Sequence, residues 1–269
     1  MIAPGYRREK RHIERRRTAV CRTFSMACMC RVRELVEISG NSDARSVLYA
    51  VPHAGAGVAA VKRMCRSLPD RWLTVGVRLP GRESRTREEP LTDLNRLTDG
   101  LAKSIGEHAG DREIHLYGHC AGAIIAYEVA RRLPAARLRG LAVSAHQSPD
   151  RVPVGEVWRW PREEFLARVR EDGYLPDELV GNPELLSLVE PALRADYRAI
   201  ECHHHDPEVI DVPVLALLGT EEHAVPVEDI RSWGEWTSAG FGLELLPGGH
   251  NLLSDSPVEV ARAIDRRFG

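Results

Sequence analysis

The sequence lacks any apolar run long enough to cross a membrane, and its cysteines are few. No stretch of about 18 apolar residues occurs in the chain, which argues against a membrane-spanning helix. The six cysteines have neither the density nor the spacing of a disulfide framework, and the C-M-C triplet at 28–30 lacks a second pair to complete a zinc site. No internal repeat or low-complexity tract is present. We therefore expect one soluble globular domain in a reducing cytoplasm.

Net charge is also small, but it is unevenly distributed. The formal net charge is −2, yet residues 1–33 contain ten Lys and Arg against two acidic residues, which leaves 27 against 37 for residues 34–269. The first segment has few apolar residues and no clear period, so we predict a disordered basic extension over 1–33. It lacks the apolar core of a signal peptide and the motifs of a nucleic-acid-binding arm. Because Met26 and Met29 lie just ahead of the first folded segment, our hypothesis is that the extension has no function.

From Arg45 onward the chain alternates strand-like and helical patterns. The expected strands are the apolar runs 47–51, 73–77, 114–117, 138–144, 214–218 and 243–246. Strands that alternate with helices predict an α/β fold with a mostly parallel sheet, covered on both faces, and with reactive groups at the carboxyl ends of the strands. The interval 152–207 breaks this rhythm with helix-type patterns at 163–169 and 185–200. We predict that it forms an inserted helical lid within a domain that spans 34–269.

The run G-H-C-A-G at 118–122 has the pattern G-x-S-x-G with Cys120 in place of the serine. It follows the strand-like run 114–117 and precedes a helical pattern at 123–133. The two glycines permit a tight, strained turn that lifts a nucleophile above the sheet, and the positive end of the helix favours a thiolate there. A free cysteine is more often a small buried hydrophobe. The strand, the glycines and the helix together favour a nucleophile.

Two further strand ends carry polar residues suited to the same chemistry. The run 214–218 is followed by G-T-E-E-H at 219–223, and the run 243–246 is followed by P-G-G-H, which ends at His250. The order nucleophile, acid, histidine is that of α/β-hydrolases, in which each partner lies on a loop after a different strand. We predict that His250 is the general base.

With these residues in view, the chain resembles a type II thioesterase, the free-standing α/β-hydrolase that serves polyketide synthases and nonribosomal peptide synthetases. The similar segments are V-P-H-A-G-A-G at 51–57, L-P-G-R-E-S-R at 79–85, G-H-C-A-G at 118–122, L-R-A-D-Y at 193–197 and P-G-G-H at 247–250. The resemblance covers the chain from about residue 47 to its end. It implies the α/β-hydrolase fold and an oxyanion hole formed by the backbone N–H groups of Ala54 and Ala121.

Two positions depart from the family pattern. The family usually has serine at position 120 and aspartate where this chain has Glu222, which keeps a carboxylate for the Nδ1–H of His250. Glu221 and Asp229 are alternative acids. A cysteine nucleophile depends less on that acid, because a Cys-His pair can form thiolate and imidazolium without it.

No metal or diffusible cofactor is predicted. The run C-H-H-H at 202–205 contains residue types that bind metal ions, but no set of four ligands is visible in the sequence. The nucleophile, the base and the oxyanion hole suffice for the chemistry, and the phosphopantetheine arm arrives with the substrate.

The resemblance implies that Cys120 takes an acyl or aminoacyl group from the phosphopantetheine thioester of a carrier protein. Hydrolysis would then edit or release that group. Because a thiol exchanges one thioester for another of similar energy, transfer from Cys120 to a second carrier is the alternative. A catalytically silent, carrier-binding scaffold is a third reading, and a serine replacement made to trap an acyl-enzyme would give the same sequence.

Carrier proteins are typically acidic, so a partner of this kind implies a locally basic docking face. We also expect a monomer that binds neither nucleic acid nor membrane. The candidate docking residues are Lys62, Arg63, Arg66, Arg82, Arg85 and Arg87.

Overall fold

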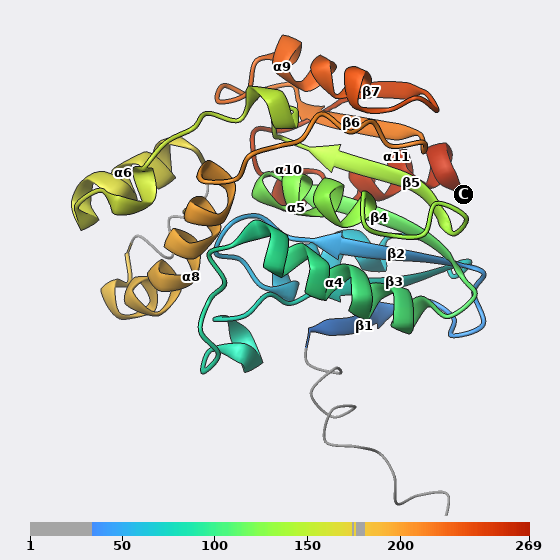
Figure 1. The fold of residues 1–269 in the computed structure, drawn as a ribbon, viewed down its shortest axis with the longest axis horizontal. Coiled ribbons are helices and arrows are strands. Elements are labelled where there is room, and N and C mark those ends of the chain that lie inside the picture. Colours follow the sequence, from blue (N-terminus) through green and yellow to red (C-terminus); the bar gives the residue numbers. More distant parts are fainter. Residues whose placement is uncertain (1–33, 174, 176–180) are drawn as a thin grey trace, which may run out of the picture. The chain divides into compact units, whose positions relative to one another are not determined.

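The computed structural model describes residues 34–173, 175 and 181–269, so the predicted basic extension at 1–33 lies outside the described residues. One seven-stranded sheet has the order β1-β3-β2-β4-β5-β6-β7 (Figure 1). The strands are β1 (Leu35–Ser39), β2 (Ser46–Val51), β3 (Trp72–Val77), β4 (Glu113–His119), β5 (Leu138–Ser144), β6 (Val214–Gly219) and β7 (Phe241–Leu246). All neighbouring pairs are parallel except β1 with β3. The predicted α/β fold with a mostly parallel sheet is confirmed.

Each of the six predicted runs forms a strand, and β1 is the strand that the sequence pattern missed. It pairs antiparallel with β3 at the edge of the sheet, and four of its five residues are not fully buried. An edge strand has one neighbour and a weak apolar signal, so its pattern does not stand out from a loop.

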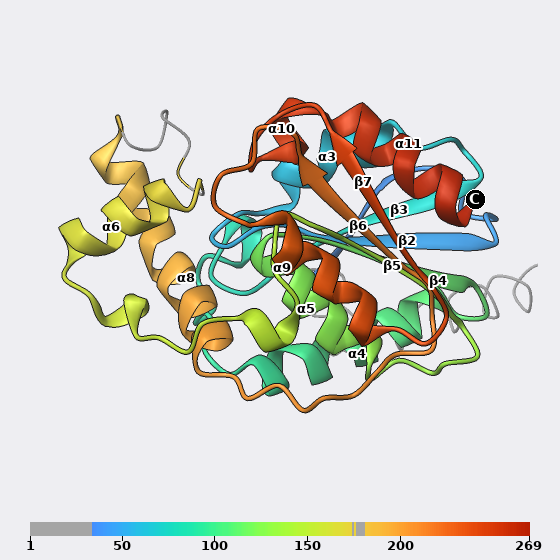
Figure 2. The same cartoon turned by 90° about the horizontal axis from the view of Figure 1, so that it is seen from above.

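Alternating side chains along the strands supply two separate apolar layers. In β2, Val47 and Tyr49 belong to the core on one face, whereas Leu48 and Ala50 belong to the core on the other. Helices α4 (Leu94–Ala109), α5 (Ala121–Ala130) and α9 (Val227–Arg231) cover the first face, and α3 (Lys62–Arg66), α10 (Leu252–Asp255) and α11 (Pro257–Phe268) cover the second (Figure 2). The sheet is therefore buried on both sides, as a parallel sheet requires.

Helix α5 is buried along its whole length. All ten of its residues are buried, because it packs against the sheet, α4 and α8. An apolar surface all round is typical of such a central helix. The helix thus provides a rigid mount for the residue at its N-terminus, which is Cys120.

The interval 152–207 forms an insertion between β5 and β6. It contains η4 (Val157–Arg159), α6 (Arg162–Glu171) and α8 (Pro183–Glu201), and the two helical patterns in this interval match α6 and α8. These helices lie beyond the carboxyl ends of the parallel strands (Figures 1 and 2). Among the described residues, no helix combines the length and the apolar character needed to span a membrane.

Candidate active site

Cys120 occupies the sharp turn between β4 and α5. Its backbone has φ 53° and ψ −126°, and its N–H donates to the carbonyl of Ser144 at 2.8 Å. Positive φ is uncommon for a residue with a side chain, and it is typical of the strand-to-helix turn that presents a nucleophile. The structure therefore places Cys120 as the G-x-C-x-G pattern predicts, at the N-terminus of a helix.

The glycines on either side of Cys120 are required by close backbone contacts. A Cβ on Gly118 would lie 2.1 Å from the carbonyl oxygen of Gly122, and a Cβ on Gly122 would lie 2.5 Å from those of Val51 and Pro52. No side chain fits at such distances. The glycines thus let α5 start directly against the end of β2, where the oxyanion-hole segment begins.

His250 and Glu222 face each other across two loops. The Nδ1 of His250 lies 2.7 Å from Oε2 of Glu222, while Oε1 of Glu222 accepts the N–H groups of Ala224 and Val225 at 2.7 and 3.3 Å. Of the alternative acids, Glu221 is exposed and Asp229 lies 3.5 Å from a guanidinium nitrogen of Arg151. Glu222 is therefore the acid that the structure brings to His250.

The charges of this pair favour a protonated histidine. Burial lowers the pKa of His250, but its hydrogen bonds to Cys120 and to the carboxylate of Glu222 outweigh that cost and raise the pKa to about 10. For Glu222, burial raises the pKa, yet the hydrogen bond and the charge of His250 hold it below its usual range. The ring of His250 thus has hydrogen bonds to the sulfur of Cys120 and to the carboxylate of Glu222, the arrangement that a Cys-His pair needs for nucleophilic chemistry.

Three other histidines lie near this pair; His119 and His146 are buried, and His53 is half-buried. Burial lowers the pKa of His53 and of His146 to about 4, and it lowers that of His119 well below its usual value. The Nδ1 of His119 lies 2.8 Å from Oγ of Ser144, and its ring lies 5.7 Å from that of His53 and 5.9 Å from that of His250, measured between centroids. His250 is thus the histidine of this group that carries a proton at neutral pH.

A cavity of about 360 Å³ lies beside Ala121, the residue after Cys120. The core contributes Ala54, Ala121 and Val225 to its lining, and the insertion contributes Val152 and Ile200 among others. Ala121 begins α5, so its N–H is one of the first-turn groups that no helix carbonyl accepts. The cavity therefore contains both residues whose N–H groups were predicted to form the oxyanion hole.

The insertion also packs close to His250. Cys120 is fully buried, and a Cβ on Gly173 would lie 3.1 Å from the Cβ of His250. Tyr197 of α8 hydrogen-bonds to Asp172 at 2.7 Å beside the same cavity. The insertion therefore lies against His250 and against the cavity that Ala121 lines.

A buried ion pair joins three segments that are far apart in the sequence. Arg82 makes two contacts of 2.8 Å with the carboxylate of Asp196, and Oδ2 of Asp196 also accepts the N–H of Gly55 at 2.8 Å. Their side chains are 6% and 4% exposed. This ion pair, here called the clamp, links helix α8 to the loop that contains Ala54.

The clamp corrects one sequence-based assignment. Arg82 was expected on a docking face, but that interpretation is wrong, because a buried guanidinium paired with Asp196 is not presented to a partner. Arg85 is only half-buried and pairs with Glu88 at 2.6 Å. The remaining candidates are exposed: Lys62, Arg63, Arg66 and Arg87.

Comparison with known proteins agrees with this geometry. The family model of the thioesterase domain matches residues 46–268. The chain belongs to the thioesterase domain family. This thioesterase is 31% identical over 221 residues to thioesterase PikA5 of Streptomyces venezuelae, a match that covers 81% of this chain and 79% of that protein.

Solved thioesterases share the fold of this thioesterase. The RedJ thioesterase from the prodiginine biosynthetic pathway of Streptomyces coelicolor has a TM-score of 0.73 at 30% identity, covering 82% of this chain and 84% of its own. The type II thioesterase BorB from the borrelidin biosynthetic cluster has a TM-score of 0.70 at 30% identity, covering 82% and 90%. The fold is that of the α/β-hydrolases, and the chain is an enzyme of a family that hydrolyses thioesters.

Proposed function

We propose that this thioesterase acts as a type II thioesterase, which hydrolyses acyl or aminoacyl groups from the phosphopantetheine arm of a carrier protein in polyketide or nonribosomal peptide biosynthesis. The observation that carries the proposal is the array of Cys120, His250 and Glu222, with the Nδ1 of His250 2.7 Å from Glu222. The family membership and the names of PikA5 and BorB support the substrate class.

The first half of the proposed reaction forms an acyl-enzyme. The thiolate of Cys120 attacks the thioester carbonyl carbon, and the N–H groups of Ala54 and Ala121 bind the resulting oxyanion. The intermediate collapses with cleavage of the carbon–sulfur bond to the pantetheine arm. The leaving thiolate takes the proton of the His250 imidazolium, so the carrier departs as a free thiol.

The second half returns the enzyme to its starting state. Neutral His250 accepts a proton from water while the oxygen of that water attacks the acyl group on Cys120. The carbon–sulfur bond to Cys120 breaks, the carboxylic acid leaves, and the thiolate and imidazolium are restored. Glu222 holds the ring of His250 in the tautomer and orientation that both steps need.

In this proposal the insertion acts as a lid. It bounds the cavity and covers Cys120 and His250, which keeps bulk water from the acyl-enzyme until the carrier arm withdraws. Helices α6 and α8 would move together to admit the arm, since Tyr197 of α8 is hydrogen-bonded to Asp172 at the end of α6.

The thiol at position 120 favours transfer as a second candidate. An acyl group on Cys120 remains a thioester, so its transfer to the thiol of a second carrier changes the free energy little. An oxyester on serine is lower in free energy than a thioester, so transfer from serine to a thiol would be unfavourable. Water and a second thiol then compete for the same acyl-enzyme.

Intact-protein mass spectrometry of the thioesterase mixed with an acylated carrier, with and without an empty second carrier, separates these outcomes. We expect acyl mass on Cys120, its loss as free acid, and no adduct in Cys120→Ala. Acyl mass that moves to the second carrier would instead support transfer. Cys120→Ser is the matched variant, and we expect it to keep hydrolysis and lose transfer. No adduct and no turnover with a panel of acyl groups would leave only the carrier-binding scaffold.

A further inference from the structure

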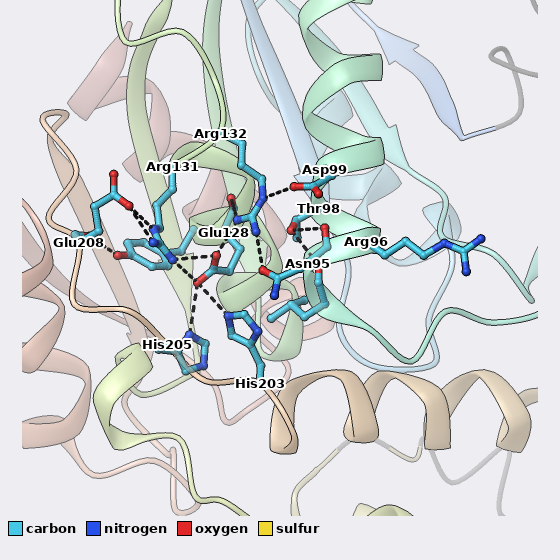
Figure 3. A network of polar contacts seen from close by, with 12 residues as sticks. Asn95, Arg96, Thr98, Asp99, Glu128, Arg131, Arg132, His203, His205 and Glu208 are labelled. Carbon is cyan, nitrogen blue, oxygen red and sulfur yellow. Dashed lines mark hydrogen bonds and ion pairs between the residues drawn. The ribbon is translucent and has the colours of Figure 1, made fainter.

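Three side chains with metal-ligating atoms meet at the far end of the nucleophile helix. Glu128 lies in the last turns of α5, and His203 and His205 lie just after the end of α8 (Figure 3). Their ligand atoms all lie within 4.8 Å of one another. The sequence predicted no metal in the run 202–205, because no set of four ligands is visible there. Glu128, which the structure adds, is 77 residues from His205 in the sequence.

The distances within this cluster suit a metal ion better than hydrogen bonds. Oε1 of Glu128 lies 3.4 Å from Nε2 of His203 and 3.3 Å from Nδ1 of His205. A typical N–H···O bond is about 2.9 Å long. Zinc with bonds of about 2.0–2.1 Å has ligand atoms about 3.3 Å apart in a tetrahedral site. Two of the three distances between ligand atoms therefore already match the separation that zinc requires.

The two imidazoles also have buried nitrogens that lack a partner. The side chains of His203 and His205 are 6% and 7% exposed, and Glu128 is fully buried. Among the described residues, neither Nε2 has an aligned hydrogen bond. A buried polar nitrogen without a partner is costly, and coordination of a metal ion would remove that cost at Nε2 of His203, whereas His205 would bind the ion through its Nδ1.

The arginines around Glu128 do not exclude a cation. Arg131 and Arg132 contact its carboxylate at 3.0 and 2.6 Å. Each of them also pairs with a second carboxylate, because Glu208 lies 2.7 Å from Arg131 and Asp99 lies 2.7 Å from Arg132 (Figure 3). Three carboxylates against two guanidinium groups leave the cluster with a formal charge of −1 when both histidines are neutral.

We propose that Glu128, His203 and His205 form a zinc site, with water in the fourth position. Two imidazoles and one carboxylate are a donor set that suits zinc rather than the oxygen-preferring magnesium or calcium. The ion would tie the end of the insertion to α5, the helix whose N-terminus carries Cys120. Its role is structural, because it fixes where the insertion rejoins the core. Arg131 and Arg132 both donate to Oε2 of Glu128, and Arg131 also lies 3.1 Å from Oε1, so the carboxylate is held in place.

The test begins with the full-length protein, purified without a polyhistidine tag and stripped with a chelator. After addition of zinc and removal of the excess, we expect one zinc per chain by elemental analysis and a melting temperature several degrees above that of the stripped protein. Cobalt in place of zinc should give the visible absorption of a tetrahedral site without thiolate charge-transfer bands. Absence of bound metal in the wild-type protein would overturn the proposal.

Variants separate this site from adventitious binding. His203→Gln and His205→Gln should each lose the zinc and the rise in melting temperature. The matched controls are His204→Gln and Cys202→Ser, which alter exposed residues of the same run and should keep both. Zinc that persists in the first two variants, or that disappears in the controls, would contradict the assignment. Far-UV circular dichroism shows whether each variant is folded.

Discussion

Cys120 holds a backbone conformation that strains a residue with a Cβ. Its φ of 53° and ψ of −126° lie outside the regions that ordinary residues occupy, at a cost on the order of 1–3 kcal/mol. The surrounding contacts maintain this strain: the N–H of Cys120 is bound by Ser144, and the flanking glycines allow β2 and α5 to approach. The strained turn places the buried side chain of Cys120 within hydrogen-bonding reach of His250.

At the residue scale, the first prediction concerns the acid of the triad. Glu222→Gln removes the negative charge that helps to hold the pKa of His250 near 10, so less of His250 will be the imidazolium that activates the sulfur of Cys120 near neutral pH. We expect the alkylation of Cys120 by iodoacetamide to slow about tenfold at pH 6 and much less at pH 9. The measurement is a pH–rate profile by mass spectrometry, and Glu221→Gln, at an exposed neighbour, is the control.

The same substitution should lower the free energy of unfolding, and the loss should depend on pH. A histidine whose pKa is raised on folding stabilises the folded state fully below its unfolded pKa of about 6.5, and this stability is lost as the pH rises through about 10. Glu222→Gln should therefore cost roughly 1.5–3 kcal/mol of unfolding free energy at pH 6 and little above pH 10. Equal losses at both pH values would count against the ion pair.

At the element scale, the clamp connects the insertion to the loop that contains Ala54. Asp196 in α8 accepts hydrogen bonds from Arg82, which lies in the loop after β3, and from the N–H of Gly55, which is adjacent to Ala54. Helix α8 of the proposed lid and the loop of the proposed oxyanion hole are thus held by one carboxylate. We infer that Asp196 is a positioning residue for the N–H of Ala54.

Asp196→Asn should therefore affect the transition state more than binding. We expect kcat to fall at least tenfold with little change in KM, since loss of one oxyanion donor costs about a hundredfold or more. Alkylation of Cys120 by iodoacetamide needs no oxyanion hole and should be unchanged. Glu190→Gln breaks another ion pair on α8, with Arg194 at 2.9 Å, and should leave kcat nearly intact. A drop in alkylation equal to that in kcat would point to general disruption instead.

Helix α3 is the element that we propose for carrier docking. It follows the loop of Ala54 closely in the sequence, and Lys62, Arg63 and Arg66 are exposed on it. Reversal of Arg63 and Arg66 to glutamate should raise KM for a carrier-bound thioester about tenfold and leave KM for a small soluble thioester unchanged. The same reversal at Arg262 and Arg266, exposed on α11, is the control. Equal kinetics on both substrates would rule out α3.

At the scale of the whole molecule, buried neutral histidines make the fold sensitive to acid. Burial lowers the pKa of His53, His115 and His146 to about 4 and that of His119 further. The stability that these groups confer is full above their unfolded pKa of about 6.5 and is lost as the pH falls toward 4, because the unfolded chain binds the protons first.

We therefore expect the free energy of unfolding, measured by urea titration, to fall between pH 6.5 and 4 by up to about 1.4 kcal/mol per pH unit for each histidine. His115 is the best residue for a test, because it packs away from the nucleophile, with its ring 4.7 Å from that of Trp72. His115→Phe should make the decline less steep. An unchanged slope would show that carboxylates alone govern acid unfolding.

The last prediction concerns the basic extension, which lies outside the described residues. The family match begins at residue 46, and the described fold begins at residue 34. We expect deletion of residues 1–28 to leave both kcat and KM within about twofold of the full chain, because the proposed mechanism uses no residue from that segment. A sharp loss of turnover would show that the extension contributes to function.

The sequence by itself determined the features that have local causes. Apolar runs of strand length, punctuated by glycine, marked six strands, and the G-x-C-x-G and P-G-G-H turns marked Cys120 and His250. The chain order of α/β-hydrolases brought Glu222 into consideration. Each of these signals depends on a few adjacent residues, so no knowledge of packing was needed to read it.

Tertiary structure alone decided which charged residues are buried and which partners they contact. Arg82 looks like a surface arginine in the sequence, yet it pairs with Asp196, 114 residues away. Glu128 looks like an exposed helix residue, yet it meets His203 and His205 inside the protein. Long-range ion pairs have no local signature, because the same side chains are stable in water; only the packing of α8 and α5 against the sheet removes the solvent and makes each partner necessary.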